Sequence, residues 1–186
     1  MPAFHSLYAI IKKKVGDMKV LSKQKNSRMC FICGMDNPMG FKSQFYNMED
    51  GSVITPVRYK VEHQSFPQRV HGGLIAAMLD ELACRAYWVN GDYTLGVTTS
   101  MELKYRKPVP YEEDLFAQGY LIMDKSRMFK TFSKIIDAEG TVFAEATTTY
   151  LKLPPEKIAQ NVDVHTEMPY LIEDCIKEFH YVSKMN

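Results

Sequence analysis

The chain has 186 residues, enough for one domain with a substantial hydrophobic core. Its 23 basic residues nearly balance 22 acidic ones, so the net charge does not indicate a nucleic-acid-binding protein. Four cysteines in a chain of this length argue against a disulfide scaffold, and no apolar run is long enough to span a membrane. Because the N-terminus also lacks the pattern of a signal peptide, we expect a cytoplasmic protein with reduced thiols.

The first 28 residues differ in composition from the rest of the chain. They hold seven lysines and arginines and a single acid, Asp17. Apolar residues between Leu7 and Val15 follow a helical spacing, so the segment is predicted to be a partly helical basic arm over residues 1–29. A contact with nucleic acid or a membrane surface would need more charge than this arm carries, and we expect neither partner.

A Cys-x-x-Cys pair, Cys30 and Cys33, opens the next segment and is followed by Gly34. One such pair supplies half of a zinc site. Cys84 and Cys175 are the other cysteines, and both lie far away in segments of helical pattern. The sequence therefore predicts a tight turn at Gly34 and no bound metal.

Strand-like segments follow this turn. Alternation of apolar and polar residues predicts strands over 41–48 and 53–61, separated by a turn at Gly51. Residues 63–69, which include Gln64 and Ser65, are predicted to form a loop that leads into a glycine motif.

The glycine motif is His71-Gly72-Gly73, and it opens a predicted helix over residues 72–89 that is apolar on nearly all sides. A helix start offers unpaired N–H groups and the positive end of the helix dipole. Glycine at this place lets an oxygen atom approach those groups closely. The motif is therefore a candidate site for stabilising an oxyanion.

Asp80 is the first acidic residue of this helix and lies two turns beyond the glycines. Glu81 has Arg85 four residues later, which is the favourable orientation for a helical ion pair. Asp80 has no basic residue three or four positions away on either side. The sequence thus explains Glu81 structurally and marks Asp80 as a candidate base or nucleophile.

Four more strand-like segments follow without an intervening helix, over residues 94–106, 115–124, 127–137 and 141–153. Strands joined by short turns predict an antiparallel sheet. One long apolar helix must be covered by that sheet, so the expected fold is an α+β domain over residues 30–153, with the sheet curled around the helix. Apolar residues at helical spacing between 169 and 184 predict an amphipathic helix in a C-terminal extension over residues 154–186.

This order of elements, with its motifs, resembles the hotdog-fold acyl-CoA thioesterases, in particular those of the phenylacetate-degradation type. The resemblance covers roughly residues 30–153. It rests on four motifs, which are Cys30-x-x-Cys33-Gly34 with Asn37-Pro38-x-Gly40, Val70-His71-Gly72-Gly73 with Leu79-Asp80-Glu81, Thr98 with Leu103-x-Tyr105-Arg106-Lys107-Pro108, and Glu145-Ala146-Thr147.

The resemblance implies that Asp80 is the catalytic carboxylate and that the N–H of Gly72 or Gly73 polarises the thioester carbonyl. It implies that Thr98 positions water or Asp80, and it leaves His71 in a role that supports the turn. The family also implies paired subunits, as a dimer or a dimer of dimers, with active sites at the interface. It implies an acyl-CoA substrate and no cofactor beyond the coenzyme A of that substrate.

Other residues implied at the site are less distinctive. The family's loop often supplies an Asn or Gln, and Gln64 and Ser65 occupy the nearest positions here. Arg106 and Lys107 are candidate partners for the nucleotide end of coenzyme A, and solvated charges at a strand end are an equal alternative.

Two other functions stay open from the sequence. One is a hydratase or dehydratase of the same fold, which pairs a catalytic histidine with an acid. The other is a non-enzymatic acyl-CoA sensor that binds DNA through the basic arm, although the arm has no helix-turn-helix pattern. For a hydrolase, the sequence does not decide whether Asp80 attacks the carbonyl itself or activates water.

Overall fold

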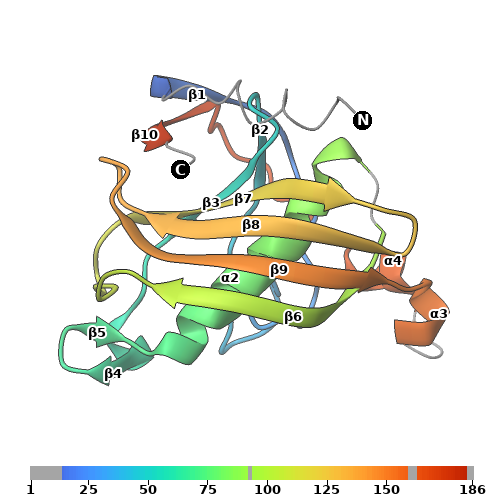
Figure 1. Ribbon diagram of the computed structural model, residues 1–186, viewed down its shortest axis with the longest axis horizontal. Helices are drawn as coiled ribbons and strands as arrows, with labels where there is room; N and C mark the ends of the chain where they lie inside the picture. Colours follow the sequence, from blue (N-terminus) through green and yellow to red (C-terminus); the bar gives the residue numbers. More distant parts are fainter. Residues whose placement is uncertain (1–13, 92–93, 159–162, 184–186) are drawn as a thin grey trace, which may run out of the picture.

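The computed structural model describes residues 14–91, 94–158 and 163–183. Its main feature is an eight-stranded sheet in the order β10-β1-β2-β3-β7-β8-β9-β6, in which every neighbouring pair is antiparallel (Figure 1). The strands are β1 (Lys14–Lys23), β2 (Tyr46–Met48), β3 (Val53–Val57), β6 (Gly96–Tyr105), β7 (Leu115–Asp124), β8 (Met128–Ile136), β9 (Val142–Lys152) and β10 (Glu178–Ser183).

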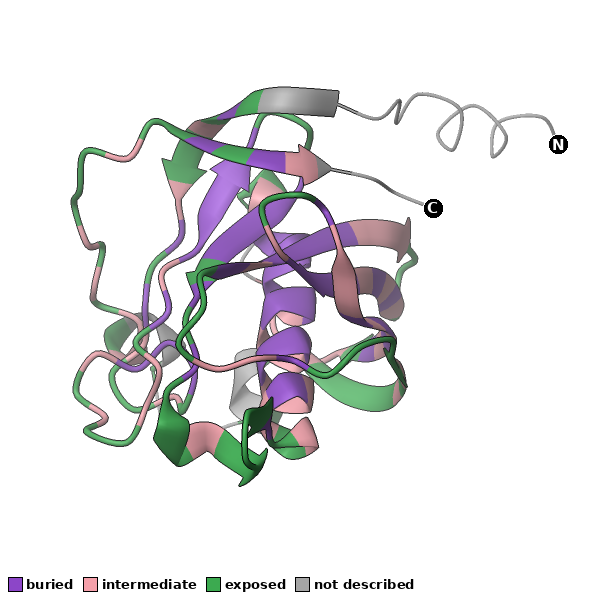
Figure 2. Ribbon diagram, turned by 90° about the vertical axis from the view of Figure 1, so that its left-hand side faces the viewer, coloured by how far each residue is buried: buried purple, intermediate pink, exposed green. Residues whose placement is uncertain are grey.

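One long helix, α2 (Gly72–Tyr87), crosses one face of this sheet (Figure 1). Its side chains Met78, Leu79 and Leu82 are fully buried against the inner face of the strands, and Figure 2 shows buried positions along most of its length. Gly119 on β7 permits the close approach, because a Cβ there would lie 3.1 Å from the main-chain oxygen of Leu82. The predicted α+β hotdog arrangement of a sheet around a central helix is confirmed.

Smaller elements frame the two ends of the helix. A hairpin of β4 (Gln64–Phe66) and β5 (Arg69–Val70) precedes it, after a short 3-10 helix at Val61–His63. A 3-10 turn at Trp88–Asn90 follows it, and Gly91 ends that turn with a φ of 82°. Two single-turn helices, α3 (Pro155–Ile158) and α4 (Val164–Glu167), follow β9. No helix of the described residues is both long and apolar enough to cross a membrane.

The flanking segments differ from their predicted structure. The helix expected in the N-terminal arm falls mostly on residues outside the described ranges, and Lys14–Lys23 form strand β1, which pairs with β2 and β10. The prediction of a C-terminal helix between residues 169 and 184 is wrong. Residues Glu178–Ser183 form β10, in which Phe179 and Tyr181 lie on one face and pack with Met18.

The reason is the spacing of the buried residues. Phe179 and Tyr181 are two residues apart, as required for one face of a strand, and pairing with β1 outweighs the helical spacing of the apolar residues before them. Both ends of the chain thus extend the sheet beyond the predicted domain of residues 30–153. The proposed domain boundaries themselves stay a prediction.

Candidate functional site

The carboxylate of Asp80 is held by two hydroxyl groups from the sheet. Thr98 Oγ1 on β6 donates a hydrogen bond of 2.9 Å to Asp80 Oδ1. Tyr150 Oη on β9 lies 3.0 Å from the same Oδ1 and 2.7 Å from the main-chain oxygen of Asp80, so its one proton is shared between these two acceptors. The other carboxylate oxygen, Oδ2, accepts no hydrogen bond from the described residues and is available to a substrate or a water molecule.

Tyr150 was not among the residues predicted from the sequence. Its side chain is 1% exposed and its ring stacks on Phe129, with 4.7 Å between the ring centroids. Burial, together with the negative charge of Asp80, raises the pKa of the Tyr150 hydroxyl, so that it stays protonated and acts as a donor. Thr98 and Tyr150 are paired across β6 and β9, a register that the sequence of either strand does not reveal.

The helix start has the predicted backbone geometry. His71 is the N-cap residue, and its Nδ1 accepts a hydrogen bond of 3.0 Å from the Gly73 N–H. This hydrogen bond is consistent with the predicted role of His71 in supporting the turn. It also occupies the Gly73 N–H, which is therefore not free to bind an oxyanion. The N–H of Gly72 donates to no acceptor among the described residues, and its carbonyl accepts from Tyr105 Oη at 2.9 Å. Gly72 is thus the better candidate for an oxyanion donor.

The helix start and Asp80 are not brought together within one chain. Asp80 lies eight positions after Gly72 in the α-helix, which corresponds to about 12 Å along the axis. A carbonyl group that accepts a hydrogen bond from Gly72 therefore cannot also contact the Asp80 carboxylate of the same chain. His71 is one residue further away, so it does not form an acid–base pair with Asp80 either.

The remaining predicted residues lie around the helix start. Gln64 and Ser65 are exposed on the β4–β5 hairpin, which adjoins that end of α2 (Figure 1). Arg106 is bound to Glu145, with its Nη2 2.6 Å from Oε1, whereas Lys107 has no charged partner among the described residues. Lys107 lines a shallow pocket formed by the chain around the helix start and by the end of β6 with the residues after it. Its other lining residues include Arg69, Gly72, Tyr105 and Pro108.

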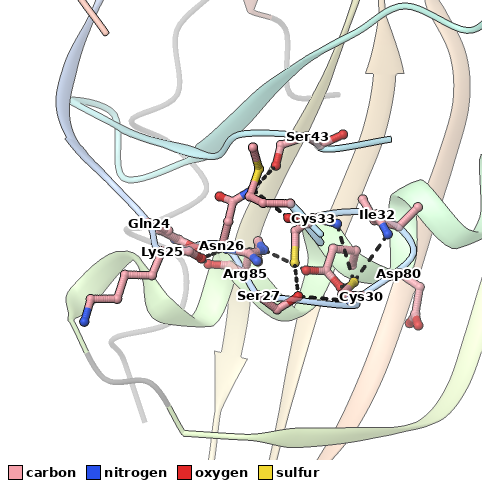
Figure 3. Close-up of polar contacts among 12 residues, drawn as sticks. Gln24, Lys25, Asn26, Ser27, Cys30, Ile32, Cys33, Ser43, Asp80 and Arg85 are labelled. Carbon is pink, nitrogen blue, oxygen red and sulfur yellow. Dashed lines mark hydrogen bonds and ion pairs between the residues drawn. The ribbon is translucent and has the colours of Figure 1, made fainter. Parts of the chain in front are cut away.

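Glu81 and Arg85 form the predicted ion pair, with 2.8 Å between Glu81 Oε1 and Arg85 Nε. The structure adds that the Arg85 side chain is completely buried, over the ring of Phe45. Figure 3 shows Arg85 beside the cysteine pair, and a carboxylate oxygen of Glu81 lies within 4.8 Å of both cysteine sulfur atoms. A hydrogen bond from Cys30, together with the charge of Arg85, lowers the pKa of Cys33 to about 7, and the same hydrogen bond and burial raise that of Cys30.

Comparison with known proteins shows a similarity over part of the chain. Residues 68–149, which span α2, strands β6 to β8 and most of β9, match the model of the thioesterase superfamily. The chain is similar to this superfamily over that stretch. It is 25% identical over 137 residues to rat acyl-coenzyme A thioesterase THEM4, an alignment that covers 73% of this chain and 58% of the rat protein. The chain thus spans little more than half the length of this curated relative.

Solved structures agree on the fold. A thioesterase superfamily protein with 27% identity superposes with a TM-score of 0.63, covering 67% of this chain and 61% of that protein. A thioesterase protein from Streptococcus pneumoniae, solved with coenzyme A, has a TM-score of 0.54 and 20% identity, covering 60% of this chain and 85% of that protein. At this identity the second similarity shows the fold alone.

Proposed function

We propose that the protein hydrolyses an acyl-CoA thioester to the free acid and coenzyme A. The observation that supports this proposal best is Asp80, a carboxylate with one oxygen held by Thr98 and Tyr150 and the other oxygen free. A thioester is already activated because its thiolate leaves readily, so a carboxylate and an oxyanion donor suffice. The activity of the curated relatives, named as acyl-coenzyme A thioesterases, is consistent with this chemistry.

The reaction follows from these groups. Either Asp80 Oδ2 attacks the thioester carbonyl carbon, giving a mixed anhydride that water then opens, or it takes a proton from the attacking water. In both cases the carbonyl oxygen becomes negative and the Gly72 N–H at the helix start stabilises it. The carbon–sulfur bond then breaks, and coenzyme A leaves as a thiolate that takes up a proton. In the first route this step gives the anhydride, which water opens to the carboxylic acid and the ionised Asp80. In the second route it gives the carboxylic acid directly, and Asp80 loses the proton that it took from water to the thiolate or to solvent.

The complete site requires a second copy of the chain. The separation of about 12 Å between Gly72 and Asp80 along α2 means that the two groups act on one carbonyl only if they come from different subunits. Strand β6 is suited to join them. It is one of the two edge strands of the sheet, most of its residues are exposed, and it carries Thr98 beside Asp80. A long exposed edge strand favours pairing with another chain.

The nucleotide end of coenzyme A is assigned to the pocket beside the helix start. Arg69 and Lys107 bring two positive charges to it, and the main chain of Gly72 forms part of its wall. Arg106, in contrast, is engaged by Glu145 and is not proposed as a direct phosphate ligand. Gln64 and Ser65 are proposed to contact the acyl-CoA from the neighbouring hairpin. A reducing compartment such as the cytosol is proposed for the protein, and the four unpaired cysteines are compatible with it.

The experiment is a measurement of coenzyme A release from a panel of short, medium, long and aromatic acyl-CoAs. The proposal predicts turnover of at least one class by the wild-type chain and loss of that turnover in Asp80→Asn. Asp114→Asn is the matched control, because Asp114 is a solvated carboxylate before β7 whose pair with Arg58 is exposed. The absence of hydrolysis across the panel, or unchanged hydrolysis in Asp80→Asn, would overturn the proposal.

A further inference from the structure

The Cys30–Cys33 turn has a geometry in which both sulfur atoms face the same side. The N–H groups of Ile32 and Cys33 point at Cys30 Sγ, at 3.3 and 3.5 Å, and the Gly34 N–H donates to the Cys30 carbonyl at 2.8 Å. A Cβ at Gly34 would lie 2.4 Å from that carbonyl oxygen, so the turn requires glycine. The Cys33 N–H lowers the pKa of the Cys30 thiol, although the hydrogen bond with the Cys33 side chain and burial raise it by more. The ionised thiol is the form that binds metal ions.

The expectation of no metal rested on the presence of only two ligands, and the fold supplies a third. Glu81 Oε2, from the central helix, lies 3.5 Å from Cys30 Sγ, and the donor atoms of Cys30, Cys33 and Glu81 all lie within 4.8 Å of one another. Zinc–sulfur bonds of about 2.3 Å and zinc–oxygen bonds of about 2.0 Å place tetrahedral ligand atoms about 3.5 to 3.8 Å apart. The three donors are thus already close to this spacing.

The surroundings orient the carboxylate. Arg85 Nε holds Glu81 Oε1 at 2.8 Å, which leaves Oε2 directed toward the cysteines. Ligating carboxylates in metal sites are commonly fixed by such a second hydrogen bond. The buried Arg85 guanidinium also faces the Cys33 sulfur (Figure 3). With both thiols ionised, the three anionic ligands and this guanidinium leave two negative charges, which one divalent cation neutralises.

We propose that Cys30, Cys33 and Glu81 bind one divalent, thiophilic metal ion, for which zinc is the best match to the donor set. Two thiolates and a carboxylate are borderline-soft ligands, which zinc accepts in tetrahedral sites. Glu81 is 22% exposed, so a water molecule can take the fourth position. The ion would fasten the cysteine turn to α2 at the residue after Asp80 and has no role in hydrolysis itself.

The test is a titration of the reduced, full-length chain with Co²⁺ under anaerobic conditions. We expect a near-ultraviolet thiolate-to-cobalt band and the visible bands of tetrahedral cobalt, saturating at one ion per chain and displaced by zinc. Cys175→Ser is the matched control because Cys175 is exposed, and it should bind like the wild type. Cys30→Ser and Cys33→Ser should each lose the charge-transfer band, and Glu81→Gln should weaken binding by at least about tenfold.

A second measurement avoids dependence on how well the variants fold. Zinc should raise the melting temperature of the wild type and of Cys175→Ser, and a chelator should reverse the increase. The proposal is overturned if the reduced wild-type chain takes up no cobalt. It is also overturned if the band persists in Cys30→Ser, or if zinc leaves the melting temperature of the wild type unchanged.

Discussion

Thr98 and Tyr150 are cross-strand partners on β6 and β9, and their hydroxyl groups meet at a single oxygen atom, Asp80 Oδ1. This arrangement fixes the orientation of the carboxylate and leaves its other oxygen, Oδ2, without a hydrogen bond from the described residues. The two hydroxyls are therefore expected to position Asp80. An unassisted threonine hydroxyl does not ionise near neutral pH, so it cannot serve as the base in place of Asp80.

The first prediction concerns these two hydroxyls. Thr98→Ala and Tyr150→Phe each remove one hydrogen bond to Asp80, and each should lower kcat by about tenfold, equivalent to roughly 1.4 kcal/mol of barrier. KM should change little, because neither group is proposed to contact the substrate. Steady-state kinetics on the best acyl-CoA test this, and a loss in either variant as large as that of Asp80→Asn would show that the roles are misassigned.

The second prediction concerns Asp80 itself. Asp80→Asn keeps the shape of the side chain and removes its charge, so kcat should fall by at least about a thousandfold, or roughly 4 kcal/mol. Acyl-CoA should still bind, because the pocket beside Gly72 is intact. Single-turnover kinetics and a binding measurement on the same variant separate these effects. Near-normal turnover would refute the assignment.

The third prediction concerns the Glu81–Arg85 pair. Glu81→Gln leaves the fully buried Arg85 guanidinium without its carboxylate partner, and removing one partner of a buried pair typically costs about 3 to 5 kcal/mol of the free energy of unfolding. Urea denaturation should show a shift toward the lower end of this range, since Glu81 is partly exposed. Asp114→Asn, which breaks the exposed pair with Arg58, should shift the free energy by less than about 1 kcal/mol. Equal stability of the two variants would contradict this account.

The fourth prediction concerns Lys134 on β8, which is 1% exposed. Burial lowers its pKa from 10.5 to about 8. Between these values the unfolded chain binds the proton that the folded chain has lost, so this residue makes the free energy of unfolding rise with pH from about 8 to 10.5. Relative to wild type, Lys134→Met should show a smaller increase over this range in urea denaturation. Parallel pH profiles for the two proteins would refute the assignment.

The sequence predicts the central part of the fold because local pattern and tertiary contacts agree there. The apolar run after Gly72 makes a buried helix, and the alternating segments of residues 115–153 form β7, β8 and β9 within two residues of the expected limits. The edges of the sheet are different. The strand β1 gains its structure from pairing with β10, about 160 residues away, and neither segment alone carries that information.

The candidate site likewise combines residues that the local sequence identifies with residues that only the folded structure brings together. Asp80 stands out in the sequence because it lacks a helical partner, and Thr98 enters through the family resemblance. Tyr150 requires the register between β6 and β9, and Glu81 becomes a neighbour of Cys30 only when the N-terminal turn packs on α2. Helix geometry alone, in contrast, already separates Gly72 from Asp80 by about 12 Å, so a site that uses both groups on one carbonyl needs two chains.

The central claim is that Gly72 of one subunit and Asp80 of another act on the same thioester, and complementation tests it most directly. Gly72→Val and Asp80→Asn chains, each inactive alone, are co-expressed with different affinity tags, and the mixed dimer is isolated. One of its two sites then combines an intact Gly72 with an intact Asp80. The account predicts that hydrolysis returns to about half of the wild-type rate per dimer. A mixed dimer that is as inactive as either parent would contradict it.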